Sequence, residues 1–110
     1  MAYTKNEAVK IAKVFFAKAA KKYPIRSAYL FGSYAKGTQK DYSDIDIAAV
    51  FAEAIEPEKY YEEAIEVFHE AQEYNSMLEV ICFREDEFEK DGGSIIAQIK
   101  KEGIKIELGI

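Results

Sequence analysis

Two largely apolar segments, separated by a short polar stretch, constrain the fold of this chain more than any other feature. The first, Arg26–Phe31, leads directly into Gly32-Ser33, and the second, Ile45–Phe51, contains a single charged residue, Asp46. Apolar runs of this length, bounded by glycine and polar residues, are typical of strands. We therefore predict two strands, with the residues that carry chemistry at the end of one and the start of the other.

Two aspartates, Asp44 and Asp46, mark the start of the second strand. Residues two apart on a strand project from the same face. Carboxylates side by side on a mostly apolar strand repel each other and lose hydration, so a fold tolerates them when a divalent cation lies between them. Oxygen-only ligands of this kind suit Mg²⁺. Taken alone, the pair could equally be a loop end that faces water.

The Gly-Ser pair predicts an anion site. Gly32 allows the backbone to approach a ligand closely, and we expect Ser33 to cap a short helical turn that Gly37 ends. Free N–H groups at such a turn bind anions, and Lys36 would add a positive charge. A phosphate chain held here would meet a metal held by the two aspartates, which is the layout needed for in-line attack on a phosphoryl group. An ordinary strand-end turn with a surface lysine is the alternative.

The pattern Gly-Ser, ten residues, Asp-x-Asp resembles the signature of the nucleotidyltransferase fold superfamily, the DNA polymerase β-like group. The stretch from Gly32 to Ile47 is most similar to the minimal nucleotidyltransferases, or MNT domains, and among these to the MntA-type antitoxins that are paired with HEPN-domain toxins. The resemblance implies a third acid on the strand after the second helix. Glu79, within the apolar run Met77–Phe83, matches that position but is one methylene longer than the usual Asp.

The resemblance also implies an activity. It predicts a nucleotidyltransferase that uses Mg²⁺, with two ions held by the catalytic carboxylates Asp44, Asp46 and Glu79. The nucleoside triphosphate would bind at the Gly-Ser turn and Lys36. The reaction would transfer a nucleoside monophosphate, AMP from ATP, to a hydroxyl of a partner protein, and the HEPN-domain toxin would be modified on a tyrosine.

Two other functions remain open from the sequence. The domain could be a non-catalytic antitoxin that occludes its partner, with the acidic helix predicted over residues 57–74 against a basic surface. Partner binding that is sensitive to salt but survives Asp44→Asn would favour this reading. The domain could also be a sensor that binds Mg-ATP without transfer, which tight binding without release of pyrophosphate would favour.

The rest of the chain alternates helices and strands. Apolar residues recur at three- and four-residue steps in three segments, and Thr4 and Glu7 form a predicted capping box at the first. The predicted helices are Thr4–Tyr23, Pro57–Tyr74 and Ser94–Glu102, and the remaining strands are Met77–Phe83 and Ile104–Leu108. Residues 85–91 are expected to form a short helix or loop. This order predicts an α/β or α+β layer fold, with a small mixed sheet of about four strands covered by helices on one face.

Several smaller expectations concern side chains. Residues 52–58 should link elements rather than pack. On the second helix, Tyr74 should lie on the inner face and the glutamates should face solvent. The tyrosines Tyr34 and Tyr42 flank the site and could stack on a base. The lone histidine, His69, should lie at the surface, and the lone cysteine, Cys82, should be a buried thiol.

Composition bounds the functional class. The 110 residues fit a single domain, residues 1–110, and the net charge of −5 argues against nucleic acid as the main ligand. No apolar run reaches the length of a membrane span, and the N-terminus lacks the apolar region of a signal peptide. We therefore expect a cytoplasmic protein without a disulfide. Exposed apolar surface on so small a domain favours a homodimer or a hetero-oligomer.

Overall fold

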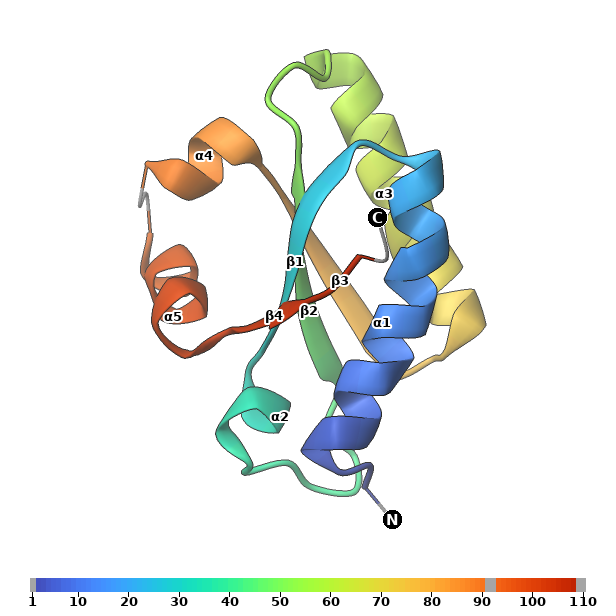
Figure 1. Cartoon of the computed structure of the whole chain (residues 1–110), viewed down its shortest axis with the longest axis vertical. Coiled ribbons are helices and arrows are strands. Elements are labelled where there is room, and N and C mark those ends of the chain that lie inside the picture. Colours follow the sequence, from blue (N-terminus) through green and yellow to red (C-terminus); the bar gives the residue numbers. More distant parts are fainter. Residues whose placement is uncertain (1, 91–92, 109–110) are drawn as a thin grey trace.

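The computed structural model describes residues 2–90 and 93–108, which form one layered α/β domain (Figure 1). Four strands form one sheet: β1 (Ile25–Phe31), β2 (Ile45–Phe51), β3 (Leu78–Arg84) and β4 (Ile104–Ile106). Five helices accompany it: α1 (Lys5–Lys22), α2 (Ser33–Lys36), α3 (Pro57–Tyr74), α4 (Glu85–Glu89) and α5 (Ser94–Glu102). The predicted fold class and element order are confirmed, and the boundaries of β2, α3 and α5 are those expected from the sequence.

The sheet is mixed and has the strand order β3-β2-β1-β4. Strand β1 pairs antiparallel with both β2 and β4, whereas β2 and β3 are parallel and are joined by the crossover through α3. The register places Asp46 opposite Phe31 on one side and opposite Glu79 on the other. The polar ends of the predicted strands therefore meet at one end of the sheet.

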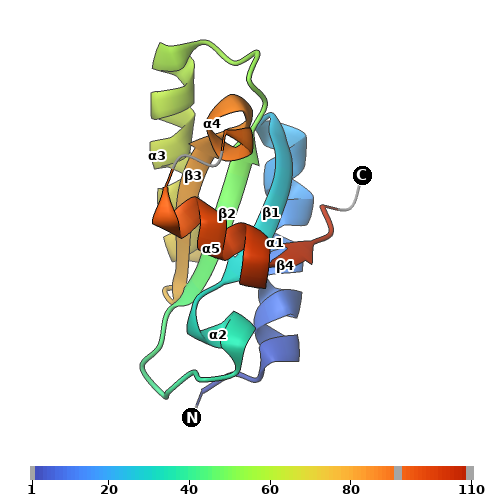
Figure 2. The same cartoon turned by 90° about the vertical axis from the view of Figure 1, so that its left-hand side faces the viewer.

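Helices cover both faces of the sheet, which corrects the expectation of one covered face. Figures 1 and 2 show α1 and α3 on one face, α4 and α5 on the other, and α2 beyond the end of the strands. The first face holds the larger apolar core, into which α1 contributes Phe16 and α3 contributes Val67. The second face holds a smaller cluster that includes Phe88 of α4 and Ile99 of α5. Both helices of this smaller layer therefore pack on the sheet through apolar side chains.

Local signals set the helix boundaries as predicted. Thr4 caps α1: its Oγ1 accepts a hydrogen bond from the Glu7 amide at 3.1 Å, and its own amide donates to Glu7 Oε1 at 2.8 Å. The helix stops at Lys22 because Pro24 cannot continue the helical hydrogen bonds. Pro57 opens α3, where a missing N–H removes no intrahelical bond.

Four side-chain expectations need correction. Residues 52–58 do pack, because Ile55 is buried in the core. Tyr74, expected on the inner face of α3, is half-exposed and contacts Phe15 at the surface. Cys82 is half-buried rather than fully buried, although burial still raises the pKa of its thiol to about 12.

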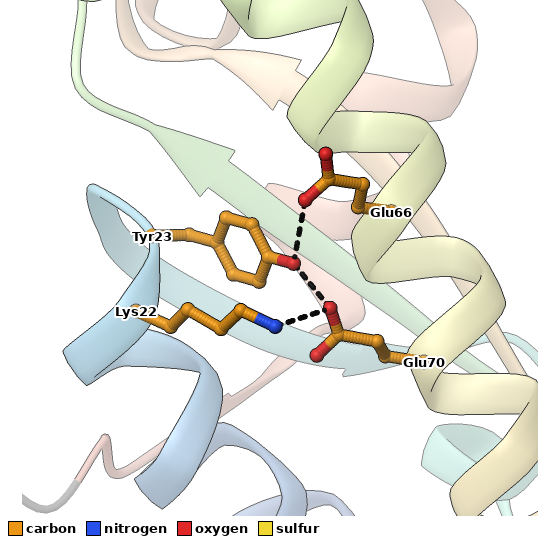
Figure 3. A network of polar contacts seen from close by, with 4 residues as sticks. All are labelled: Lys22, Tyr23, Glu66 and Glu70. Atoms are coloured by element: carbon orange, nitrogen blue, oxygen red, sulfur yellow. Dashed lines mark hydrogen bonds and ion pairs between the residues drawn. The ribbon is translucent and has the colours of Figure 1, made fainter.

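The fourth correction concerns the acidic face of α3, which is not simply solvated. Glu66 and Glu70 both accept a hydrogen bond from the Tyr23 hydroxyl, at 3.0 Å for Glu66 Oε2 (Figure 3). Lys22 Nζ lies 2.9 Å from Glu70 Oε2. Hydrogen bonds from Tyr23 and Lys22 hold the pKa of Glu70 below its usual range. This network fastens the end of α1 to α3.

Candidate active site

Three carboxylates gather at one end of the sheet. One is on β2, one is on β3, and one lies directly before β2. Asp46 and Glu79 are register partners on adjacent parallel strands, so their side chains leave the same face next to each other. Asp44 precedes β2 by one residue and is exposed, whereas Asp46 and Glu79 are half-buried. The structure therefore brings together the three acids predicted from the sequence.

Their proximity has an electrostatic consequence. Burial, then repulsion from Glu79 and from Asp44, raises the pKa of Asp46 to about 6. A hydrogen bond with Asp44, burial and repulsion from Asp44 raise the pKa of Glu79. A bound cation would relieve this repulsion, and an oxygen-only donor set suits Mg²⁺. Within the described residues, no three metal-binding side chains yet converge on one point, so binding would require these carboxylates to turn toward the ion.

Gly32 lies directly against the Asp46 carboxylate. Its backbone has φ 74° and ψ −152°, a combination that residues with a side chain rarely adopt. A Cβ at this position would overlap Asp46 Oδ2. Two independent reasons therefore favour glycine at position 32: its backbone conformation and the close approach of the Asp46 carboxylate.

The turn after β1 differs in one detail from the prediction. Gly32 occupies the N-cap position of α2, and Ser33 is the first helical residue rather than the cap. The Ser33 hydroxyl has no hydrogen-bond partner within the described part of the chain. Gly37 ends the turn in the left-handed conformation with φ 78°, as predicted. The Ser33 hydroxyl is thus available to bind a ligand at the end of the sheet where the carboxylates lie.

The tyrosines beside the site have different environments. Tyr34 is fully buried, and its hydroxyl has no hydrogen-bond partner, so the expectation that it stacks on a base is wrong. Its ring instead packs into the larger core and anchors α2. Tyr42, in the loop between α2 and β2, is 82% exposed, and its stacking on a base stays a prediction.

Lys36 has an acidic neighbour that the sequence did not reveal. Its Nζ lies 3.5 Å from Glu102 Oε2 at the end of α5, and both side chains are about half-exposed. Because the two residues are 66 positions apart in the chain, no local pattern could predict the pair. The contact ties α2 to α5 and leaves a role of Lys36 in phosphate binding as a prediction.

Comparison with known proteins defines the class of protein. Residues 10–107 match the family described as polymerase beta, nucleotidyltransferase. The match spans most of the chain and includes every residue of the candidate site, so the chain belongs to this family and is a nucleotidyltransferase domain.

Individual relatives agree with this class. Over 40 residues the chain is 48% identical to MJ1215 of Methanocaldococcus jannaschii, which is named as a candidate protein adenylyltransferase. That match covers 36% of this chain and only 46% of the relative.

Solved structures show the same fold. A candidate nucleotidyltransferase from Sulfolobus solfataricus superposes with a TM-score of 0.61 at 24% identity, over 96% of this chain and 87% of that one. A chain of a mutant MntA-HpeT toxin–antitoxin complex superposes with a TM-score of 0.57 at 20% identity, over 88% and 72%. A toxin–antitoxin structure with AMP-PNP gives a TM-score of 0.51 at 23% identity, over the same shares. Among the residues that the structure describes, every helix is too short or too polar to span a bilayer.

Proposed function

We propose that this nucleotidyltransferase domain transfers AMP from ATP, with Mg²⁺, to a hydroxyl of a partner protein, and that this partner is a HEPN-domain toxin. The observation that carries the proposal is the gathering of Asp44, Asp46 and Glu79 beside Gly32. Half-buried carboxylates that repel one another destabilise a fold unless a cation or a proton joins them. Their conjunction with a glycine turn supports a site for a metal and a phosphate chain.

Each part of the site has a proposed role. The backbone at Gly32 and the free hydroxyl of Ser33 would bind the phosphates, and the absence of a side chain at Gly32 lets the Asp46 carboxylate lie directly against this turn. Asp44, Asp46 and Glu79 would hold Mg²⁺, which when bound neutralises the phosphates and stabilises the attacking and leaving oxygens. Glu79 would also accept the proton of the acceptor hydroxyl. Lys36 would exchange Glu102 for the leaving pyrophosphate.

The acceptor is proposed to be a protein for two reasons. The relative in Methanocaldococcus jannaschii is named for protein adenylyltransferase activity, and two structures of similar fold are toxin–antitoxin complexes, one of them with AMP-PNP. In addition, the described elements build the sheet, its two helical layers and the turn α2 beside the site. A large acceptor would therefore supply its own binding surface.

The experiment that tests the proposal measures binding and transfer separately. Calorimetry would follow ATP binding with and without Mg²⁺, and a purified HEPN-domain protein would be incubated with ATP labelled at the α- or the γ-phosphate. We expect Mg²⁺-dependent binding and label transfer from the α-position alone. Asp46→Asn should reduce transfer by at least about a hundredfold, whereas Glu53→Gln, an exposed acid beyond the other end of β2, should leave it unchanged.

The outcomes also separate the alternatives. Binding of ATP without any label transfer would indicate a nucleotide sensor. Two results together would indicate an occluding module. The wild type and Asp46→Asn would form the complex with the HEPN-domain protein equally well, and neither of the two would bind ATP. Full transfer by Asp46→Asn would refute the proposed role of the carboxylates.

A further inference from the structure

Helix α3 carries a second apolar stripe that is not part of the core. Its inward stripe is formed by Tyr60, Val67 and Ala71. One position further round the helix, Tyr61, Ile65 and Phe68 are 67%, 59% and 38% exposed. The spacing of four and three residues aligns them on one side of the helix. Three large apolar side chains in line on a surface helix are unusual for a face that only meets water.

The position of α3 leaves this outer stripe open to a partner. In Figure 2, α3 lies at the outer side of the molecule beside β3, and α1 lies beside β1. Strand β3 is an edge strand in the order β3-β2-β1-β4, so no further strand of the described chain lies beyond it. The side of α3 that faces α1 is the one used by Glu66 and Glu70 in their contacts with Tyr23 and Lys22 (Figure 3). The outer stripe is on a different side.

The acids next to the outer stripe are free, in contrast to those that face α1. Glu58, Glu62 and Glu73 are exposed, and none of them has an ion-pair partner within the residues described. The outer surface of α3 is therefore apolar along its centre and negatively charged along one border. Such a surface fits a partner with apolar side chains flanked by basic ones.

We infer that the outer stripe of α3 (Tyr61, Ile65 and Phe68) with its acidic border docks a basic amphipathic helix of a partner protein. A second copy of this chain fits less well. A two-fold contact with the two α3 helices antiparallel would bring the two acidic borders together, and a contact of either orientation would join two chains of net charge −5. The lysines of α1 in a second copy could meet the border, but that unequal contact does not close on itself.

The test uses two labelled synthetic peptides and the full chain. One peptide repeats leucine at the helical spacing of the outer stripe, with lysines on its other faces, and the second has the same composition with the leucines spread around the helix. Fluorescence anisotropy would measure the affinity of each. We expect the amphipathic peptide to bind at least about tenfold more tightly than the scrambled one, and added salt to weaken it.

Variants of the chain locate the binding surface. The double variant Tyr61→Ser, Ile65→Ser should weaken binding of the amphipathic peptide at least about tenfold, because two anchoring side chains are lost. Val14→Ser removes a 44% exposed apolar side chain from α1 and is the matched control, expected to change the affinity less than about twofold. Circular dichroism and thermal unfolding would verify that each variant is folded.

Three results would overturn the inference. The first is equal binding of the two peptides, which would mean that charge alone drives association. The second is unchanged binding by the double variant. The third is self-association of the wild-type chain in sedimentation that Ile65→Ser abolishes, which would make a second copy the occupant. None of these results depends on nucleotidyl transfer, so the inference and the proposed function can fail separately.

Discussion

The two faces of the sheet are built from the same strands but serve different ends. The face under α1 and α3 is apolar along its whole length and contains most of the buried side chains. The opposite face has a small apolar cluster under α4 and α5 and, at one end, the half-buried carboxylates Asp46 and Glu79. The difference teaches that most of the stabilising apolar contacts of this small domain lie on one face of the sheet. The other face can then hold carboxylates that destabilise the fold.

Strand β2 shows how one segment supplies both faces. Successive side chains of a strand point in opposite directions. Ile45 and Ile47 therefore enter the larger core, while Asp46 between them points to the other face beside Glu79. A strand with apolar neighbours on both sides can therefore fix the position of Asp46 in the backbone, while its carboxylate can still turn toward an ion.

The largest expected effect tests which face carries the stability. Phe16→Ala should lower the free energy of unfolding by about 3–5 kcal/mol, because Phe16 is fully buried under the long helix α1. Phe88→Ala, on the five-residue helix α4, should lower it by about 2 kcal/mol, since a short helix can move to fill the space. Urea unfolding would measure both, and Phe16→Leu and Phe88→Leu would replace any alanine variant that does not fold. Equal losses would contradict the proposed division between the faces.

A smaller effect sharpens the comparison at the glycine turn. Gly32→Ala should lower the free energy of unfolding by about 3 kcal/mol, because its backbone conformation is strained for alanine and a Cβ overlaps Asp46. Gly37→Ala shares a positive φ but meets no atom nearby, so it should lower stability by only about 1 kcal/mol. Thermal unfolding would compare the two, and ATP binding should be weakened by Gly32→Ala alone. Identical behaviour of the two variants would argue against a functional contact between Gly32 and Asp46.

The smallest effect tests whether the carboxylate face weakens the fold. The folded-state pKa of Asp46 is raised to about 6, so the folded protein holds a proton that the unfolded chain has released between about pH 4 and 6. Asp46 therefore lowers stability as the pH rises through this window. Without metal, Asp46→Asn should be more stable than the wild type by about 1–2 kcal/mol at pH 7, after allowance for the partial exposure of the group, and by almost nothing at pH 4.

The measurement is a series of thermal melts in a chelator between pH 4 and 8. Mg²⁺ should then raise the melting temperature of the wild type at pH 7 and have little effect on the variant. A stability difference that does not change with pH would show that the neighbouring carboxylates do not destabilise Asp46. If Mg²⁺ fails to reduce the stability advantage of Asp46→Asn over the wild type, these acids do not hold the ion.

Local patterns in the sequence were enough for the elements of this fold. The Thr4–Glu7 capping box, Pro24 and Pro57 set the helix boundaries, because caps and prolines act within one turn. The apolar run around Asp46 was enough to single out that carboxylate, because a charge inside an apolar run has few structural explanations. Glu79, in contrast, was selected through the resemblance to a family. The resemblance of the motif to a family was confirmed by the match over residues 10–107.

The sequence by itself determined which residues form strands and helices, which acids are exceptional and which family the chain belongs to. Only the tertiary structure decided that Asp46 and Glu79 are register partners, that helices cover both faces and that Tyr34 is buried rather than free to stack on a base. It also decided the contacts of Lys36 with Glu102 and of Tyr23 with Glu66 and Glu70. The physical reason is range: propensities, caps and alternation act between near neighbours in the chain, whereas register, layer order and ion pairs depend on segments that meet only after the chain has folded.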